Sequence, residues 1–264
     1  MANRILYTNV IKSVSGTLSA NSEATSYPAS NLQTDNYGEV HRSTDVSSEW
    51  IKVDLGSAQT IGAVFLGNVN FTSSATIVIE GHTADSWGTP DVQETIDVSD
   101  LGDGERRNLF HPLASSSSKR WWRVTMADAG NTDGYLQTGE WMLGVDVTLD
   151  DSFDQANDRV RIRDNVEIRT EQGQAYVHTR NWRWSFDFNF TNATDTTRNQ
   201  IRALDLAVEG NGVPFAFVYD DTDPAEAYYV RMVGSNLSER KVHYNRHSIS
   251  LNLIEDTPGT EAPK

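Results

Sequence analysis

The sequence contains few residues whose types and spacing could support catalysis. It has no glycine-rich phosphate-binding loop, no Gly-x-Ser-x-Gly nucleophile turn and no His-Glu-x-x-His zinc motif. Gly102-Asp-Gly104 lacks the third glycine of a dinucleotide-binding loop, and a cysteine nucleophile is excluded because the chain has no cysteine. Carboxylates are abundant, but no two of them stand out as the acid and base of a glycosidase. The residues therefore favour a protein that binds or assembles over an enzyme.

Two histidines, His243 and His247, have a spacing that would allow both to chelate one metal ion if they lay on a helix. The local pattern is that of a strand, in which these positions lie about 13 Å apart, too far for one ion. Surface or core histidines are the preferred interpretation. The acidic stretch 150–158 likewise lacks the central Gly and terminal Glu of an EF-hand calcium loop.

Composition limits the class of protein further. The 264 residues are enough for two ordinary domains, each with its own core. The chain has no cysteine for disulfides, no run approaching about 18 apolar residues and no signal-peptide region at its N-terminus. Its net charge of −15 would repel nucleic acid and anionic membranes. We therefore expect a soluble protein made in a cytoplasm, with no nucleic-acid partner and no membrane insertion.

Alternation of apolar and polar residues predicts β-strands in the first half of the chain. Residues 50–55 place three aliphatic side chains on one face, and 61–65, 77–79 and 121–126 repeat the period of two. Clusters of Gly, Asn, Asp and Ser separate these segments. The short spacing and the polar loops favour an antiparallel sandwich or jelly roll over alternating strands and helices.

Strand signals resume after the acidic, turn-rich stretch. Residues 182–190 form the clearest predicted strand, with two tryptophans and three phenylalanines on one face. We interpret this aromatic row as core, with a ligand-stacking platform as the alternative. One helix is predicted at 194–209, where Thr197 and Gln200 have capping-box spacing and Gly210 can end the last turn.

These signals predict two domains, although a solvated loop within a single domain is an alternative for the acidic stretch. The predicted order is an N-terminal arm or strand at 1–20, a jelly-roll domain at 21–147, an acidic linker at 148–158, a β domain at 159–256 and a disordered tail at 257–264.

Several motifs of the first domain match one known family. Trp50-Ile-Lys-Val-Asp-Leu-Gly56 is similar to a W-I-x-V-D-L-G strand, and residues 27–36, 41–43, 120–124 and 131–144 match further segments of the same pattern. On these residues the region from about 20 to 147 resembles the discoidin family, the jelly-roll module of coagulation factors and many bacterial carbohydrate-binding modules. The resemblance implies an antiparallel jelly roll whose end loops bind glycans or lipid head groups.

The resemblance also implies two kinds of site. Sugar rings would stack on exposed aromatic side chains near planar polar groups, although each such side chain could equally pack inside the sandwich. The candidates for glycan binding are Tyr37, His41, Trp87 and Tyr135. The candidates for a structural calcium ion are Asn31, Asp35 and Glu140, two of which supply hard oxygen donors. Residues 31–36 lack the family's Asp-Gly pair, which weakens the calcium expectation, and no other cofactor is expected.

The order of the two domains is similar to that in a group of phage and prophage minor tail proteins. The supporting segments, similar to the tail-tube and distal-tail fold, are 182–190, 194–209, 213–219 and 228–234. The resemblance implies a mainly β virion protein: a discoidin-like jelly-roll sandwich followed by a distal-tail-like β-sandwich with one helix.

That protein would be a baseplate ring subunit at the phage tail tip, assembled in the host bacterial cytoplasm. Its expected partners are further copies of itself in a ring, expected to be a hexamer, and the tail tube and tail hub proteins. The N-terminal domain would contact host-surface carbohydrate. The alternative is a free bacterial carbohydrate-binding protein without catalytic activity. A glycan-active enzyme carrying a binding module is a third reading, for which the second half offers no recognisable catalytic domain.

Overall fold

The computed structural model shows a mainly β protein, which confirms the predicted fold class. It describes residues 3–13, 17–98, 101, 107–151, 153, 158–163, 165–178, 182–221, 226–234 and 237–257. The chain divides into two compact units, Met1–Leu149 with Phe215–Tyr229 and Asp150–Pro214 with Val230–Lys264. No helix among the described residues is long and apolar enough to cross a membrane.

The first unit extends beyond the predicted domain of residues 21–147. It includes the predicted N-terminal arm and also Phe215–Tyr229, a segment that the sequence assigns to the second domain. Strand β1 (Arg4–Leu6) pairs with β10 (Val147–Thr148) on one side and with β15 (Phe215–Val218) on the other. These pairings make the N-terminal segment an integral part of the first unit.

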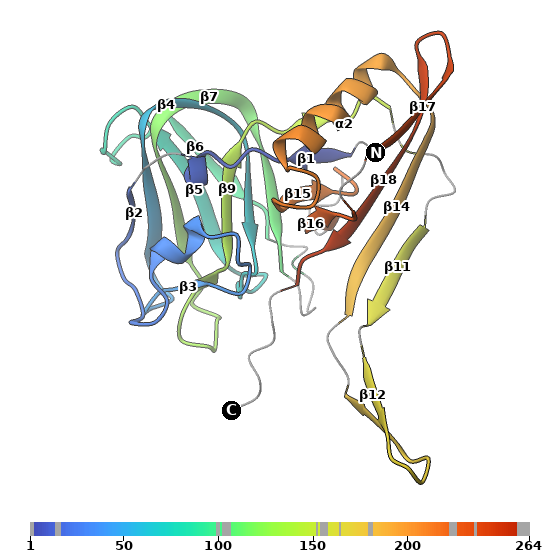
Figure 1. Ribbon diagram of the computed structural model, residues 1–264. Helices are drawn as coiled ribbons and strands as arrows, with labels where there is room; N and C mark the ends of the chain where they lie inside the picture. The colour runs from blue at the N-terminus through green and yellow to red at the C-terminus, as the bar shows by residue number, and fades with distance from the viewer. Residues whose placement is uncertain are drawn as a thin grey trace. The chain divides into compact units, whose positions relative to one another are not determined.

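The main sheet of the first unit is antiparallel (Figure 1). Its strands, in order across the sheet, are β2 (Thr17–Ala20), β4 (Glu49–Gly67), β7 (Leu109–Ala127), β5 (Thr76–His82) and β6 (Val92–Ile96), and β9 (Glu140–Gly144) also pairs with β4. The predicted strands 50–55 and 61–65 are the two ends of β4. Their register shifts between Asp54 and Gln59, where Gly56 has a φ of 71° that suits glycine.

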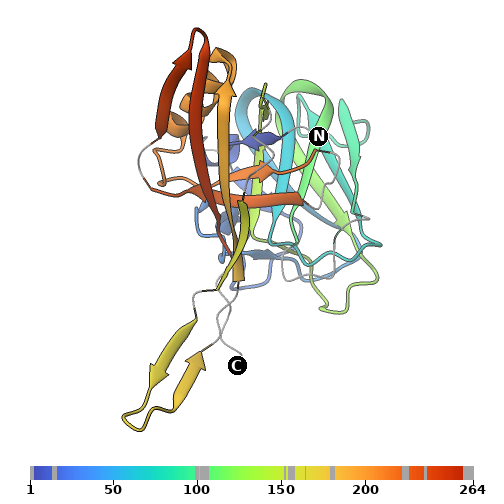
Figure 2. The same cartoon turned by 90° about the vertical axis from the view of Figure 1, so that its right-hand side faces the viewer.

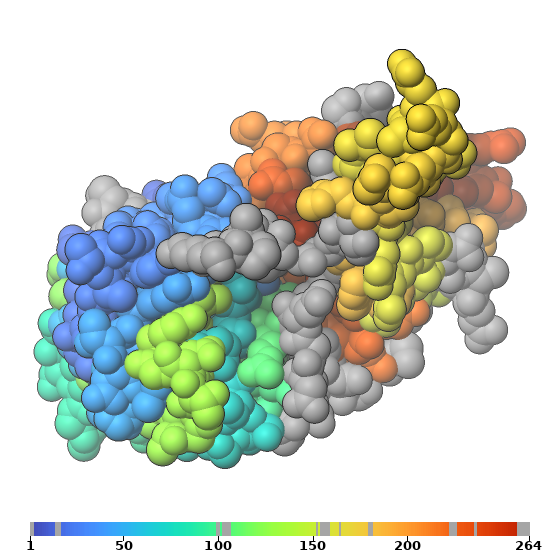
Figure 3. All heavy atoms as spheres, turned by 90° about the horizontal axis from the view of Figure 1, so that it is seen from below, coloured from blue at the N-terminus to red at the C-terminus, as the bar shows by residue number. Residues whose placement is uncertain are grey.

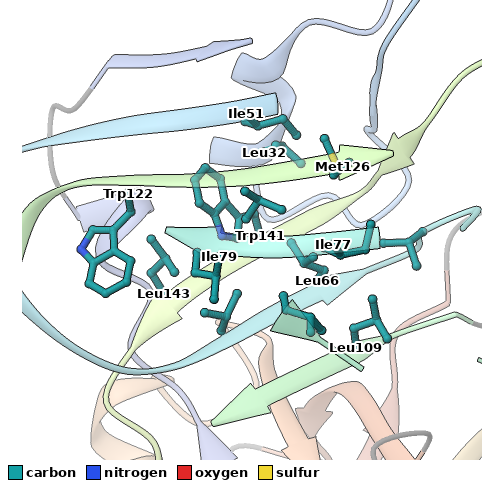
Figure 4. Close-up of a cluster of buried hydrophobic side chains, with 14 of the residues drawn as sticks. Leu32, Ile51, Leu66, Ile77, Ile79, Leu109, Trp122, Met126, Trp141 and Leu143 are labelled. Atoms are coloured by element: carbon teal, nitrogen blue, oxygen red, sulfur yellow. The ribbon is translucent and has the colours of Figure 1, made fainter. Parts of the chain in front are cut away.

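The core of the first unit is built from the inward side chains of these strands. Alternation directs Ile51 from β4 and Trp122 and Met126 from β7 into the same interior, where Trp141 and Leu143 from β9 join them (Figure 4). All five side chains are buried. Full burial of a large apolar side chain stabilises a fold by roughly 1.5–3 kcal/mol, so this interior holds the sandwich together.

Short elements complete the first unit and carry most of the predicted site residues. They are α1 (Val10–Ser13), the 3₁₀ helix η1 (Ala29–Gln33), β3 (His41–Arg42) and β8 (Gln137–Thr138). Strands β3 and β8 pair with each other, so the segments on either side of residues 41 and 138 meet.

The second unit is centred on the long strand β14 (Trp182–Ala193). That strand pairs with β11 (Asp158–Arg163) on one side and β18 (Arg246–Glu255) on the other. Strand β18 also pairs with β17 (Ser238–His243) and with the last residues of β16 (Ala227–Met232). The three phenylalanines of the predicted aromatic row are buried and its two tryptophans are half-buried, as a core interpretation requires.

Helix α2 (Asp195–Ala207) begins one turn earlier than the predicted capping box. The hydroxyl of Thr194 accepts a hydrogen bond from the Thr197 backbone N–H, so Thr194 is the N-cap and Thr197 is the third helical residue. Thr197 is instead buried, and its hydroxyl donates to Asp151 Oδ2 at 2.8 Å. The helix ends earlier than predicted: Val208 is the C-cap, Glu209 follows it with a φ of 52°, and Gly210, the predicted stop, comes one residue later with a φ of 68°.

A separate hairpin belongs to the second unit. Its strands, β12 (Val166–Arg169) and β13 (Ala175–His178), pair only with each other among the described residues and extend past β11 and β14 (Figures 1 and 2). Gly173, with a φ of 83°, lies in the connecting turn. Five of the eleven residues of the predicted acidic linker, 152 and 154–157, lie outside the described residues, as does the predicted tail after Thr257.

Candidate carbohydrate-binding surface

The outer face of the main sheet carries two adjacent rows of aromatic and charged side chains. On β4, the residues that alternate with the buried ones are Trp50, Lys52 and Asp54. On β7, the outward residues are Trp121, which lies opposite Asp54, and Arg123, which lies opposite Lys52. The same alternation that fills the core therefore places two half-buried indoles on the outer face.

Cations lie against the indole rings of this face. The Lys52 ammonium is 5.2 Å from the Trp50 ring centre and 5.6 Å from that of Trp121. Trp87, in the loop after β5, is a predicted glycan candidate, and the Arg123 guanidinium lies 4.3 Å from its ring centre. Such contacts are attractive because the ring face carries partial negative charge. Three tryptophans thus gather on this outer face, which we call the tryptophan face.

Each cation of the tryptophan face is paired with a carboxylate. Lys52 Nζ lies 2.6 Å from Asp85 Oδ2, and Arg120 Nε lies 2.6 Å from Asp54 Oδ1. The hydrogen bond from Arg120 lowers the pKa of the Asp54 carboxyl, and that from Lys52 lowers the pKa of the Asp85 carboxyl. Both carboxylates therefore stay ionised at neutral pH. The face combines flat apolar rings with fixed hydrogen-bond donors and acceptors.

A second aromatic cluster lies beside the paired strands β3 and β8. The guanidinium of Arg42 lies 4.1 Å from the Tyr27 ring centre and 4.7 Å from that of Tyr135, another predicted glycan candidate. Arg42 Nε also donates to Gln137 Oε1 at 2.9 Å. The guanidinium covers one face of each tyrosine ring, which leaves less aromatic surface for a ligand than the tryptophan face has.

The other two glycan candidates, Tyr37 and His41, lie inside the fold, which corrects the expectation of exposed platforms. Tyr37 is 6% exposed, its hydroxyl donates to Asn108 Oδ1, and its ring centre is 4.7 Å from that of Tyr229. His41 is 1% exposed, and burial lowers its pKa, which favours the neutral ring. Both side chains are buried and offer no exposed platform for a sugar.

The three calcium candidates are brought together only in part. Asp35 and Glu140 meet, but the Lys12 ammonium lies between them, 2.9 Å from an oxygen of each carboxylate. Asn31 is directed elsewhere, because its side-chain amide donates to the Val40 carbonyl at 2.8 Å. Within the described part of the chain, no three His, Cys, Asp or Glu side chains are grouped so that they could hold a metal ion. The residues present do not fit the calcium site that the resemblance implies.

The two histidines singled out by their spacing lie on different strands of one hairpin. His243 is exposed at the end of β17, and His247 is buried in β18. His247 Nε2 lies 2.8 Å from Asp195 Oδ1, in the first turn of α2. His243 is therefore a surface residue, and His247 is a buried residue that contacts the first turn of α2.

Sequence reasoning missed Trp50 and Trp121 as binding candidates. Both belong to strand motifs, and their neighbours Ile51 and Trp122 enter the core. The signal was the alternation itself, because the residue next to each buried side chain must face outward. Two outward tryptophans on paired strands could have been read from this pattern once the register was known.

No protein family model and no curated protein matches this chain. Solved structures match about half of it. Chitosan-binding module 1 derived from a chitosanase/glucanase of Paenibacillus sp. IK-5 is 24% identical, covers 52% of this chain and 99% of its own, and has a TM-score of 0.40.

Two other matches have similar extents. The family 32 carbohydrate-binding module of Clostridium perfringens NanJ, solved with galactose, is 18% identical, covers 52% of this chain and 97% of its own, and has a TM-score of 0.40. The lectin domain of lectinolysin, solved with Lewis B antigen, is 17% identical, covers 51% of this chain and 95% of its own, and has a TM-score of 0.39.

Proposed function

We propose that this protein is a non-catalytic structural subunit of a phage tail tip whose first unit binds carbohydrate. The observation that carries the carbohydrate-binding role is the tryptophan face, where three half-buried indoles share one surface with paired charged groups. The tail-tip role rests on the motif resemblance of the two domains and on the exposed hairpin of the second unit.

The chemistry of the tryptophan face fits a sugar ring. One face of a pyranose is lined by C–H groups, which pack against the flat apolar surface of an indole. The hydroxyls at the ring edge need donors and acceptors, which Asp54, Asp85 and Arg120 supply in positions fixed by their ion pairs. Because the charges of the face are paired, a neutral or weakly charged glycan fits it better than a strongly anionic one.

The test is a glycan array followed by calorimetric titration of the best ligand. Trp121→Ala and Trp50→Ala should each weaken binding by about tenfold or more, because each removes a stacking surface worth about 1.4 kcal/mol or more. Trp184→Ala is the matched control: Trp184 is also half-buried and also has an arginine, Arg159, 4.1 Å from its ring centre, but it lies in the second unit. Unchanged affinity in both first-unit variants would contradict this placement of the site.

The hairpin of the second unit supports assembly over a free binding protein. Its register places Val166, Ile168 and Tyr176 on one face. Ile168 is 62% exposed and Tyr176 is 57% exposed. A two-stranded hairpin alone is at best marginally stable in water, and clustered exposed apolar side chains mark interaction sites. The hairpin, drawn in yellow, stands out from the surface in the space-filling view (Figure 3).

The occupant that we propose for this apolar face is a second copy of the chain. The hairpin of β17 and β18 carries exposed apolar residues of its own, Val242 in β17 and Tyr244 in the turn, beside the basic side chains Arg240 and Lys241 of β17. The turn of the β12–β13 hairpin carries Glu171, whose charge is opposite to that of Arg240 and Lys241. A contact between two different surfaces of identical copies is heterologous and can close into a ring.

A free carbohydrate-binding protein is the second candidate, and the tryptophan face fits it equally well. The two readings differ in the second unit. A free module would not require an apolar hairpin, whereas a ring subunit would bury it against a neighbour.

A further inference from the structure

The first unit contains a partly buried cation that is part of the chain. Lys12, on the short helix α1, places its ammonium 2.9 Å from Asp35 Oδ1 and 2.9 Å from Glu140 Oε2. The side chain of Glu140, at the start of β9, is 0% exposed. A buried carboxylate needs a charged or hydrogen-bonding partner on each oxygen, because water cannot reach it.

Every partner of Glu140 comes from a distant part of the chain. Asn9 Nδ2 donates to Glu140 Oε1 at 3.1 Å, and the Tyr229 hydroxyl donates to Oε2 at 2.9 Å. Asn9 is fixed in turn, because its Oδ1 accepts hydrogen bonds from the backbone N–H groups of Ile11 and Leu143. We call this group of side chains around Glu140 and Lys12 the lysine centre. It links the N-terminal helix, β9 and β16.

These donors do not fit a calcium ion. Calcium takes six to eight oxygen ligands at about 2.3–2.6 Å, whereas this centre offers two carboxylates and a hydroxyl around an ammonium group. An ammonium with three N–H donors matches three oxygen acceptors, and Lys12 reaches Asp35, Glu140 and, at 3.4 Å, the Tyr229 oxygen. The number and kind of acceptors in the lysine centre therefore match a lysine ammonium group.

We propose that Lys12 supplies, as a side chain, the positive charge that the discoidin resemblance assigns to a calcium ion. The first unit then holds its closing strand and its N-terminal segment together without a divalent cation. A metal ion can be removed by a chelator, whereas Lys12 cannot. Folding of this unit, and any ligand binding by it, is therefore independent of calcium.

The first test compares thermal unfolding of the full chain with and without metal. The midpoint of unfolding should change by less than about 1 °C when EDTA or millimolar calcium chloride is added, because no metal is bound in the folded state. A rise of several degrees in calcium, reversed by EDTA, would overturn the proposal.

The second test removes the ammonium. Lys12→Met should lower the unfolding midpoint by about 6 °C or more, because it leaves Glu140 buried without its counter-charge. Lys119→Met is the control, since Lys119 forms an exposed ion pair with Asp91 at 2.8 Å and its loss should lower the midpoint by no more than about 2 °C. Equal shifts in the two variants would overturn the proposal.

A third test uses a double variant and amide hydrogen exchange, in case Lys12→Met does not fold. The double variant Lys12→Met with Glu140→Gln removes the charge on both sides and should regain part of the lost stability. Amide hydrogen exchange in residues 3–13 should be faster in the folded double variant than in the wild type, and unchanged in Lys119→Met. Wild-type exchange rates in the double variant would show that Lys12 does not hold this segment.

Discussion

The two units differ in what covers their outward-facing apolar side chains. In the first unit, Trp50 and Trp121 lie against the cation Lys52, which is itself paired with Asp85. In the second unit, Ile168 and Tyr176 are more than half exposed on a hairpin that pairs with nothing else among the described residues. The first surface is covered by charged groups of its own chain, whereas the apolar side chains of the second are exposed.

Under the proposed function, this difference distinguishes a ligand-binding surface from an assembly surface. A surface whose charges are already paired can bind a small polar ligand without rearranging, because its groups are preorganised. A surface that leaves apolar side chains in water gains stability only when another molecule covers it. This contrast is why we propose ligand binding for the first unit and subunit contacts for the second.

The largest expected effect tests whether the first unit depends on its own core. Trp122→Ala should lower the free energy of unfolding by about 3–5 kcal/mol, because it leaves a cavity between β4, β5 and β7. Its neighbour Trp121 points outward, so Trp121→Ala should lower it by no more than about 1 kcal/mol. Chemical denaturation followed by circular dichroism measures both. Equal losses would mean that the two faces of β7 are not distinct.

A smaller effect should appear in the pH dependence of stability. Burial raises the pKa of Glu140 from 4.5 to about 7 despite its contact with Lys12. The folded state therefore binds this proton more tightly than the unfolded state does. The stabilisation that results is complete below about pH 4.5 and is lost as the pH rises through about 7, a change of roughly 3 kcal/mol.

Glu140→Gln should remove this slope between about pH 4.5 and 7, which denaturation at a series of pH values would measure. Glu171→Gln, in the exposed turn of the hairpin, should leave the slope unchanged. If Glu140→Gln kept the wild-type slope, the buried carboxyl would not be its source.

The smallest effect on folding, but a clear one on assembly, is expected from the hairpin. Ile168→Asp or Tyr176→Asp should weaken self-association by at least about tenfold, or about 1.4 kcal/mol, because each places a charge in the proposed contact. The unfolding midpoint of the dissociated monomer should hardly change, since both side chains are exposed. Analytical ultracentrifugation over a dilution series measures the association. Gln172→Asp, in the hairpin turn, is the control, and an equal loss there would argue against a specific apolar contact.

The period of two predicted the main sheet and much of its core from sequence. It placed Ile51, Val53 and Leu55 on one face, and all three are buried. It could not place Tyr37 or His41, because their burial depends on segments far along the chain: Tyr37 packs against Tyr229. Local patterns carry no information about such distant contacts.

The candidate sites show the same limit. Trp87 was identifiable as a loop aromatic, but its neighbours on the tryptophan face depend on the pairing of β4 with β7. The calcium candidates Asp35 and Glu140 do meet, yet Lys12 lies outside the predicted domain of residues 21–147 and could not be associated with them from sequence. In both sites, the side chains that meet are determined by strand register or by contacts between segments distant in the sequence.

The most direct test of the proposed tail-tip role is the native mass of the full chain, measured by light scattering at several concentrations. We expect a closed ring of defined copy number, six or three, that persists on dilution and is weakened by Ile168→Asp. A strict monomer at every concentration would contradict the assembly role, and the free carbohydrate-binding protein would then be the better description.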